Sequence, residues 1–193
     1  MPQSKQNPNV METGSRIETE RLVIRPFTID DAAFVLELVN DPAWIQHIGD
    51  RGVRSLADAR EYLSKGPLAS YARNGFGFNL VQLKSTGEPI GGCGLIKREM
   101  LNDVDLGFAF LSRFRGLGYA EEAARAMLEN AEQVLGFDRI VAVVAPANTR
   151  SIALLQKLGL TYESSIHLTP DDPEEISLFV WQKSRLPPDQ DLA

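Results

Sequence analysis

The chain has 193 residues, 44% of them hydrophobic and 24% charged, and a formal net charge of −6. Its length suits one domain with a sizeable core, and its acidic balance leaves no basic surplus for binding nucleic acid or an anionic membrane. The one cysteine excludes an internal disulfide, and two histidines leave no zinc-ligand spacing, so we expect no metal. No apolar run is long enough to span a membrane and the polar start lacks a signal-peptide core, so we expect a cytoplasmic location.

The two ends of the chain differ from its middle. Residues 1–16 are polar without periodicity, and residues 184–193 contain a proline pair, so both are predicted to be flexible tails. Between them the sequence shows no linker and no internal repeat, which predicts one domain over 17–183. Cys93 lies there in the small-residue run IGGCGLI, which favours a packed strand cysteine over a nucleophile.

The first third of this domain is predicted to contain one strand and two helices. ERLVIRPF, at 20–27, alternates apolar and charged residues as a half-buried strand does. Helices are predicted over 28–39 and 55–65 because each begins with a capping-box pair, and Gly66–Pro67 is expected to stop the second. The segment at 42–54, between the helices, is predicted to be a loop that faces the substrate.

The remaining two thirds alternate strands and helices. The sequence predicts three antiparallel strands, a helix, a strand, a helix and two last strands, at 75–84, 90–99, 103–111, 119–136, 139–145, 149–158, 160–168 and 174–182. Asn148 can cap the second of these helices, and Gly159 can close it. The result is an α/β (α+β) fold, with about four helices on a mixed, mostly antiparallel sheet of about seven strands.

The junction at 111–120, LSRFRGLGYA, has the composition of an anion-binding turn. It joins a strand to a helix, and the first turn of a helix presents unpaired N–H groups and partial positive charge. Gly116 and Gly118 would let a phosphate approach the backbone, and Arg113 and Arg115 precede them. The alternative is a plain strand-to-helix turn whose glycines relieve backbone strain.

Two other pyrophosphate-binding motifs fit this junction poorly. A P-loop needs Lys and Ser or Thr directly after its last glycine, where Tyr119 and Ala120 stand. A dinucleotide-binding turn needs a small residue at the place of Glu121 and an acidic residue near Ala145. A phosphate-binding module of another fold, with ATP or a dinucleotide as its ligand, is kept as a third hypothesis.

Arg113, Gly116 and Gly118 form R-x-x-G-x-G, which resembles the acetyl-CoA pyrophosphate loop of the GNAT superfamily of N-acetyltransferases. The run GLGYAEEAARAML is similar to the branch of ribosomal-protein N-terminal acetyltransferases (RimJ/RimL type), and the resemblance covers residues 17–182. It implies splayed central strands with the pantetheine arm of acetyl-CoA between them and an N-x-x-S motif beside that arm. The cofactor-binding residues that it implies are Phe110, Leu111, Arg113, Arg115, Gly116, Leu117, Gly118, Tyr119, Ala120, Asn148 and Ser151.

The resemblance also supplies candidates for catalysis. Leu155 stands where many members carry a tyrosine general acid, but a thiol leaving group, of pKa about 8.5, needs only a weak acid. Ser151 is the candidate that orients or protonates the thiolate, and its alternative role is helix capping beside Asn148. Asp105, in DLGF, is the candidate base by family position, with a solvated strand carboxylate as the alternative. Competing candidates for the base are Glu99, Asp103 and His47.

The leading hypothesis is an acetyl-CoA-dependent N-acetyltransferase that transfers acetyl directly to a primary amine. The acceptor is a protein N-terminal α-amino group or a small amine, and the segment at 42–54 with the turn at 169–174 is expected to select it. A non-catalytic acyl-CoA sensor on the same fold is the alternative, motivated by Leu155. Phe179 and Trp181, on the last strand, suit either a homodimer edge or core packing.

Overall fold

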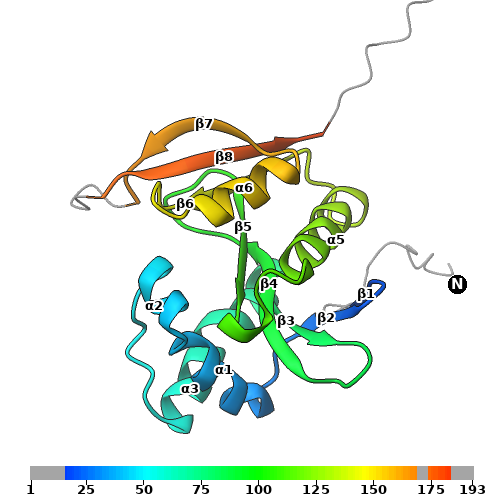
Figure 1. Ribbon diagram of the computed structural model, residues 1–193, viewed down its shortest axis with the longest axis vertical. Helices are drawn as coiled ribbons and strands as arrows, with labels where there is room; N and C mark the ends of the chain where they lie inside the picture. The colour runs from blue at the N-terminus through cyan, green and yellow to red at the C-terminus, as the bar shows by residue number, and fades with distance from the viewer. Residues whose placement is uncertain (1–15, 169–173, 184–193) are drawn as a thin grey trace, which may run out of the picture.

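The computed structural model describes residues 16–168 and 174–183, and the strands of this part form one sheet (Figure 1). The predicted tails, apart from Arg16, and most of the predicted turn at 169–174 lie outside these residues. The described sheet has eight strands in the order β1-β2-β3-β4-β5-β6-β8-β7. The strands are β1 (Ile17–Glu18), β2 (Leu22–Pro26), β3 (Phe78–Leu83), β4 (Pro89–Ile96), β5 (Val104–Phe110), β6 (Arg139–Val144), β7 (Thr161–Ile166) and β8 (Ile176–Gln182). The predicted mixed, mostly antiparallel sheet is confirmed, and the short β1 is the strand that the sequence did not indicate.

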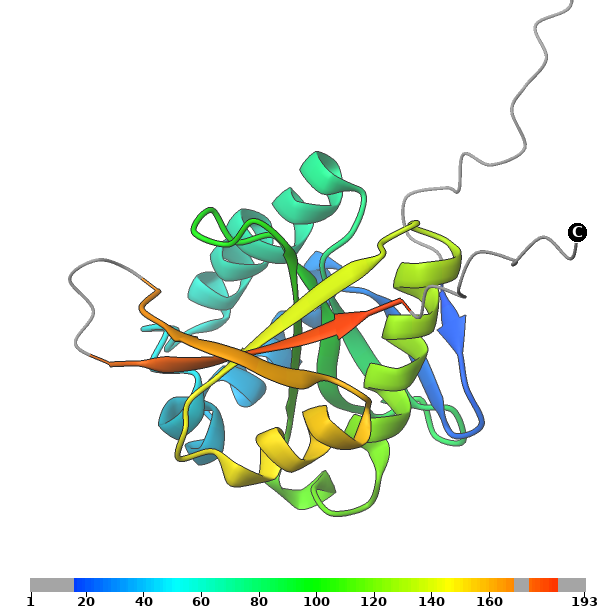
Figure 2. The ribbon, with the colours of Figure 1, turned by 90° about the horizontal axis from the view of Figure 1, so that it is seen from above.

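The two central strands part shortly after they meet. In the described sheet β5 and β6 are the only parallel neighbours, and they pair at two positions, Val104 with Ile140 and Asp105 with Val141. Beyond these residues β6 runs away from β5 at an angle, as the two ribbon views show (Figures 1 and 2). This confirms the splay that the family resemblance implied. Because pairing between the strands stops there, peptide groups on both strands face a gap.

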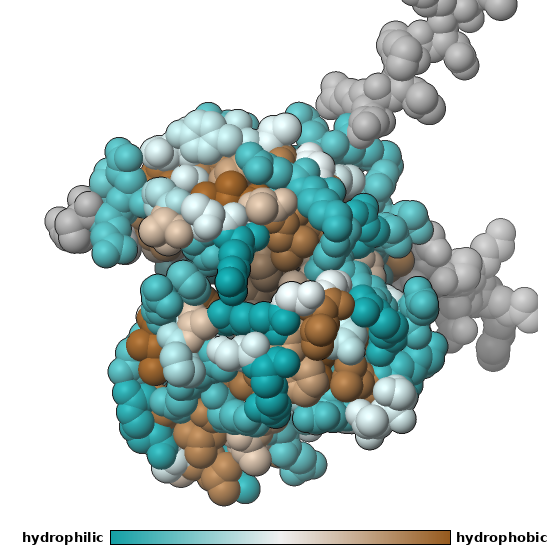
Figure 3. All heavy atoms as spheres, in the orientation of Figure 1, coloured by the Kyte–Doolittle hydropathy of each residue, from teal (hydrophilic) through white to brown (hydrophobic). Residues whose placement is uncertain are grey.

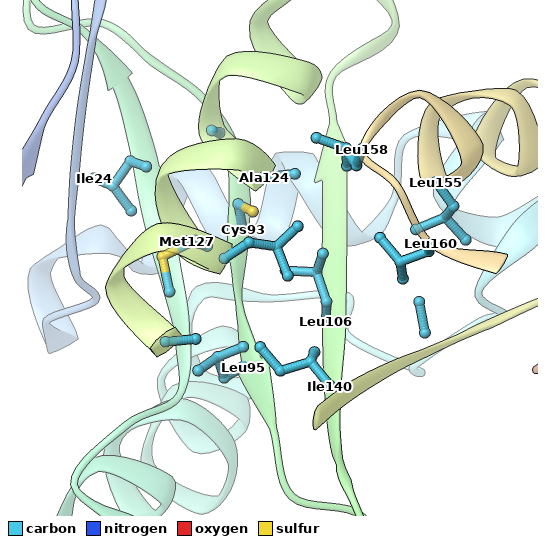
Figure 4. Packing of buried hydrophobic residues seen from close by; sticks show 14 of the residues in the cluster. Ile24, Cys93, Leu95, Leu106, Ala124, Met127, Ile140, Leu155, Leu158 and Leu160 are labelled. Atoms are coloured by element: carbon cyan, nitrogen blue, oxygen red, sulfur yellow. The ribbon is translucent and has the colours of Figure 1, made fainter. Parts of the chain in front are cut away.

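Helices cover both faces of the sheet. They are α1 (Ala32–Val39), α2 (Pro42–His47), α3 (Leu56–Leu63), α4 (Ala69–Asn74), α5 (Tyr119–Gln133) and α6 (Thr149–Lys157), with the short turns η1 (Ile29–Asp31), η2 (Ser64–Leu68) and η3 (Ser112–Phe114). One face packs against α5 and α6 through a core that includes Leu95, Leu106 and Met127 (Figure 4). The other face packs against α1–α3 through a second core that includes Phe27. Cys93 is fully buried in the first core, which confirms that it is a packed strand cysteine.

The second predicted helix does not stop at Gly66 and Pro67, so that prediction was wrong. Instead α3 continues through a π-helical turn, η2, into α4, and Pro67 is buried in that turn. In an α-helix the proline ring collides with the carbonyl four residues earlier, whereas the wider π turn moves that carbonyl aside. The helical path ends at Gly75, whose φ of +77° gives the left-handed cap that glycine favours.

The segment at 42–54 was predicted to be a loop, but it begins with a helix. Asp41 is the N-cap of α2, since its carboxylate accepts a hydrogen bond from the Ala43 N–H at 3.0 Å, and Pro42 stands in the first turn. An Asp-Pro pair can follow one helix and also start the next, so the sequence signal for the end of α1 is equally a signal for α2. The loop prediction is correct for residues 48–54.

The last strand is not an edge of the sheet. β8 lies between β6 and β7, so β7 forms that edge of the described sheet. Phe179 is 3% exposed, and Trp181 packs against the first core. Core packing therefore accounts for both side chains, and a homodimer stays a prediction.

Candidate active site

A cavity of about 1170 Å³ opens between the diverging strands β5 and β6. Gly107, Phe108 and Ala109 line it from β5, and residues 142–145 line it from β6 and the turn that follows. Figure 3 shows this face of the molecule hollowed between the part that contains β6–β8 and the part that contains α1–α3. Such a cavity suits a ligand with amide groups, because the parted strands offer peptide groups that no neighbouring strand uses.

Hydrogen bonds to β4 determine which peptide groups of β5 face the gap. The Leu111 N–H donates to the Ile90 carbonyl at 3.0 Å, and such bonds fall on alternate residues of an antiparallel pair. The peptide groups of Phe108 and Phe110 therefore point away from β4, towards β6. Phe110 and Leu111 were both predicted to offer backbone groups to the pantetheine arm. In the structure the peptide group of Phe110 faces the gap, whereas the Leu111 N–H is already hydrogen-bonded to the Ile90 carbonyl.

The N-terminus of α5 has the geometry that an anion site requires. Gly116 and Gly118 have φ values of +75° and +81°, which glycine adopts without strain. Gly118 is the N-cap of α5, and it offers no side chain to bond the first N–H groups of the helix. Leu117 between the glycines is 52% exposed, while Tyr119 and Ala120 are half-buried at the start of the helix. The N–H groups of this turn can therefore bind a phosphate group.

Two carboxylates in the first turn of α5 are bound by cations. Glu122 accepts from Nε of Arg21 at 2.6 Å, and Glu121 accepts from Nζ of Lys157 at 2.6 Å. Arg21 also donates to the carbonyl of Leu117 at 3.0 Å, which fixes the turn from its outer side. These contacts offset the negative charges that would otherwise repel a phosphate at this helix end.

The two arginines of the turn point to carboxylates and carbonyls of the protein. Arg113 pairs with Glu37 on α1, while Arg115 donates from Nε to the Phe110 carbonyl at 3.1 Å and lies 3.9 Å from Asp41. Neither arginine lines the cavity. The Arg113 side chain is 51% exposed, so exchanging its carboxylate partner for a phosphate would cost little. The phosphate contact of these arginines stays a prediction.

Asp41 connects the two halves of the site, and the sequence analysis missed it. Its carboxylate accepts from the N–H and the hydroxyl of Ser112, at 2.9 and 2.8 Å, as well as from the Ala43 N–H. Burial is the largest influence on its pKa and acts to raise it, but these donors outweigh burial and leave the pKa below its usual value. The ionised side chain therefore ties the start of α2 to η3, the turn that leads to Gly116.

The start of α6 closes one end of the cavity. The Asn148 side chain accepts from the Ser151 N–H at 3.2 Å, which confirms Asn148 as the N-cap. Ser151 joins this cap through its backbone, and its hydroxyl makes no hydrogen bond within the described residues. Asn148 and Ser151 both line the cavity. Leu155, one turn further, is 1% exposed and packs in the first core (Figure 4).

Asp105 lies at the point where β5 and β6 part. Its carboxylate accepts from Nε of Arg98 at 2.6 Å and from the Val143 N–H at 3.2 Å, so it bridges the strands just beyond their last paired residues. Asp105 is 1% exposed, so the alternative of a solvated strand carboxylate was wrong. Burial raises its pKa, and Arg98 and the Val143 N–H oppose that rise. The residue lines the cavity, where a base could meet a substrate.

The structure separates the competing candidates for the base. His47, the last residue of α2, lines the cavity together with Asp105. Asp103 instead pairs with Arg139 at 2.8 Å, and Glu99 is exposed outside the cavity. Asp105 and His47 are thus the two of the four candidates that the fold brings to the cavity.

The other half of the cavity is formed by α2, the loop that follows it, and α3. Trp44, on α2, is 5% exposed and packs edge-on against Phe78, with ring centroids 6.4 Å apart. Its Nε1–H has no hydrogen-bond partner among the described residues. Burial raises the pKa of Tyr62 on α3, while Arg51 and Arg98 act to lower it. Because residues 44–49 and 51–53 line the cavity, this segment is placed as a substrate-facing segment would be.

Two further features of the described chain concern its surroundings. No helix in residues 16–168 or 174–183 is long and apolar enough to cross a membrane. In the same ranges, no three His, Cys, Asp or Glu side chains gather in a way that could bind a metal ion.

The chain belongs to the GNAT acetyltransferases, because the family model for the "Acetyltransferase (GNAT) domain" matches residues 21–161. It is 29% identical over 161 residues to the uncharacterized protein YkkB of Bacillus subtilis, a match that covers 81% of this chain and 91% of that protein. It is also 29% identical over 154 residues to the uncharacterized N-acetyltransferase p20 of Bacillus licheniformis, covering 79% of this chain and 84% of that one. The predicted family and enzyme class are therefore confirmed.

Solved acetyltransferase structures share the fold. The acetyltransferase of Agrobacterium tumefaciens is 26% identical with a TM-score of 0.74, over 92% of this chain and all (100%) of that one. RimL, a ribosomal alpha-N-protein acetyltransferase solved in complex with coenzyme A, is 17% identical with a TM-score of 0.74. That match covers 88% of this chain and 98% of RimL, and at this identity it shows the fold alone.

Proposed function

We propose that this protein transfers the acetyl group of acetyl-CoA directly to a primary amine, in a ternary complex and without a covalent enzyme intermediate. The observation that carries the proposal is the position of two features in one fold. A helix N-terminus with two left-handed glycines follows β5, and a cavity opens between β5 and β6. The first suits a pyrophosphate, and the second suits an extended arm with amide groups.

The residues of this chain fit both the pyrophosphate and the pantetheine arm of acetyl-CoA, the proposed acetyl donor. A Cβ added at Gly116 would meet nothing within 4 Å, so the backbone there is open to a phosphate group. The peptide groups of Phe108 and the N–H of Phe110 can bond the amides of a pantetheine arm, as an added strand would. Asn148 and Ser151 would lie beside that arm, since both line the cavity. When bound, acetyl-CoA supplies the activated acetyl thioester.

Asp105 is proposed to act on the amine. Its carboxylate would attract the ammonium form and take one proton through a water molecule, so that the amine can attack. A base works best with a pKa near the working pH, and burial moves the pKa of Asp105 upwards, in that direction.

Ser151 is proposed to act on the leaving sulfur. Its hydroxyl lies in the first turn of α6, where the helix dipole favours negative charge, and it can donate a hydrogen bond to a thiolate. A thiol leaves well enough near neutral pH for such a donor to suffice. This step therefore needs no tyrosine in α6. Leu155, at the position where many members of the family carry one, is part of the core.

The acceptor is proposed to be a protein N-terminal α-amino group or a small primary amine. The likeness of the fold to RimL, an alpha-N-protein acetyltransferase, supports the first choice. The volume of the cavity that α2 and α3 help to line, about 1170 Å³, supports the second.

Amine-dependent release of CoA tests this proposal. Purified protein is mixed with acetyl-CoA and a panel of peptides and small amines, and free thiol is measured with acetylated product confirmed by mass. The proposal predicts release that depends on both substrates. Acetyl-CoA binding without release for any amine would support a sensor instead, and binding of ATP in preference to acetyl-CoA would contradict the proposed donor.

A further inference from the structure

The cavity is lined by more basic than acidic side chains, although the chain as a whole is acidic. The full sequence has 20 Lys and Arg residues against 26 Asp and Glu residues. Among residues that line the cavity, the order is reversed, with five basic and four acidic side chains. They are Arg51, Lys65, Arg73, Lys97 and Arg98, and Asp58, Glu61, Asp105 and Glu174. A cavity that selects a plain amine cation would carry the opposite balance.

Glu61, Asp58 and Asp105 bind groups of the protein. Glu61 pairs with Lys65 one turn along the same helical path. Asp58 accepts a backbone N–H from the loop before α3 at 2.9 Å. Asp105 binds Arg98 at 2.6 Å. Glu61 and Asp105 are therefore each paired with a basic side chain of the same cavity.

Two arginines keep donors that the described residues do not use. Arg51, on the loop after α2, is exposed and forms no ion pair within residues 16–168 and 174–183. Arg98 uses Nε for Asp105, and its two terminal nitrogens donate no hydrogen bond within those residues. Arg51, Arg98 and Tyr62 all line the same cavity. A guanidinium fork that faces a cavity matches the oxygens of a carboxylate or phosphate.

We propose that the acceptor is a primary amine that also carries an anionic group, a carboxylate or a phosphate, and that Arg51 and Arg98 bind this group beside Tyr62. The proposal rests on the proposed N-acetyltransferase function and names the class of its acceptor. Asp105 lies next to Arg98, so an acceptor with both charges would find a carboxylate for its ammonium and guanidiniums for its anion. An acceptor without an anion would leave the terminal nitrogens of Arg98 and the guanidinium of Arg51 without a partner on the acceptor.

Matched amines that differ only in the anionic group test the proposal. One pair is L-leucine and L-leucinamide, and the other is O-phosphoethanolamine and ethanolamine, so carboxylate and phosphate are tested separately. The amide is the less basic amine of the first pair, so a preference for leucine cannot come from a larger share of free amine. For at least one pair we expect kcat/KM to be about ten-fold or more higher for the anionic member.

Variants of Arg51 link that preference to the cavity. Arg51→Gln is expected to remove most of the preference, and Arg51→Lys to keep part of it, because lysine retains the charge without the fork. Arg60→Gln is the matched control, since Arg60 is an exposed arginine of α3 outside the cavity lining. This control is expected to keep the preference of the wild-type protein.

Thermal unfolding with the same amines gives a second readout that needs no turnover. With CoA present and also without it, the anionic member of a pair should raise the unfolding midpoint more than the neutral member does. This difference between the two members should be smaller in Arg51→Gln. Equal effects of both members in kinetics and in unfolding would overturn the proposal, as would a preference that persists in Arg51→Gln. Failure to bind acetyl-CoA would instead contradict the proposed function, so the two failures are distinguishable.

Discussion

Replacing Asp41 by Asn should loosen the connection between α2 and the turn before α5. In the wild-type protein one carboxylate oxygen accepts from the Ser112 hydroxyl and the Ala43 N–H, and the other accepts from the Ser112 N–H at 2.9 Å. An amide retains one acceptor oxygen, so its NH₂ group must face at least one of these donors. The Asp41 side chain is 9% exposed, so water replaces little of the loss. We expect unfolding to become easier by about 2 kcal/mol, or roughly 4–8 °C in Tm.

Urea unfolding at several pH values measures this loss. The pKa of Asp41 is lowered in the folded protein from its usual 3.8. Its charge therefore stabilises the fold above pH 3.8, and this stabilisation disappears as the pH falls through the folded-state pKa. The gap between wild type and Asp41→Asn should therefore shrink in acid. Asp50→Asn is the control, because Asp50 is an exposed aspartate paired with Arg54, and we expect little change there. Equal effects of the two substitutions, or a gap that is constant with pH, would refute the assigned role of Asp41.

Three further substitutions and one reagent test other parts of the structure. Asp105→Asn should lower the acetylation rate about a hundred-fold while leaving stability at neutral pH unchanged or higher, because the raised pKa means that the fold favours the neutral form. In urea, wild type should lose stability relative to this variant as the pH rises from 3.8 through the folded-state pKa, and the opposite slope would contradict the raised pKa. Ser151→Ala should change stability by less than about 0.5 kcal/mol but slow turnover, whereas Asn148→Ala should cost about 1 kcal/mol through the lost cap, as thermal unfolding and kinetics will show. Cys93 should not react with a thiol reagent in the folded protein, because it is fully buried and burial raises its pKa, and rapid labelling would contradict that packing.

Local sequence signals predicted most of the elements, because those elements depend on nearby residues. The strand at 20–27, the helix after Gly118 and the cap at Asn148 all appear where periodicity and capping placed them. The same local rules failed at Pro67, which is buried in a π turn that no short pattern reveals. They also missed α2, because an Asp-Pro pair was counted only as the end of a helix.

Those parts of the site that lie within a short stretch of sequence were predictable, whereas contacts between distant segments were not. The glycine turn and the residues at 148–151 could be found, since their chemistry lies within a few residues of sequence. The burial of Asp105 and its bond to the Val143 N–H depend on how two distant strands part. Contacts between Asp41 and Ser112, and the shared placement of arginines in the cavity, likewise arise only from tertiary packing. Charge counts over the whole chain even suggest the wrong sign for that cavity.

Acetyl-CoA binding to a matched pair of glycine variants tests the central claim most directly. Gly116 and Gly136 lie at opposite ends of α5, have φ values of +75° and +73°, and would each place a Cβ in open space. Glu at either position therefore adds the same backbone strain and the same charge, and only Gly116→Glu puts that charge at the proposed phosphate site. In a calorimetric titration, wild type and Gly136→Glu should bind acetyl-CoA alike, and Gly116→Glu should lose the binding. Equal binding by both variants, or no binding by wild type, would contradict a donor site at the N-terminus of α5.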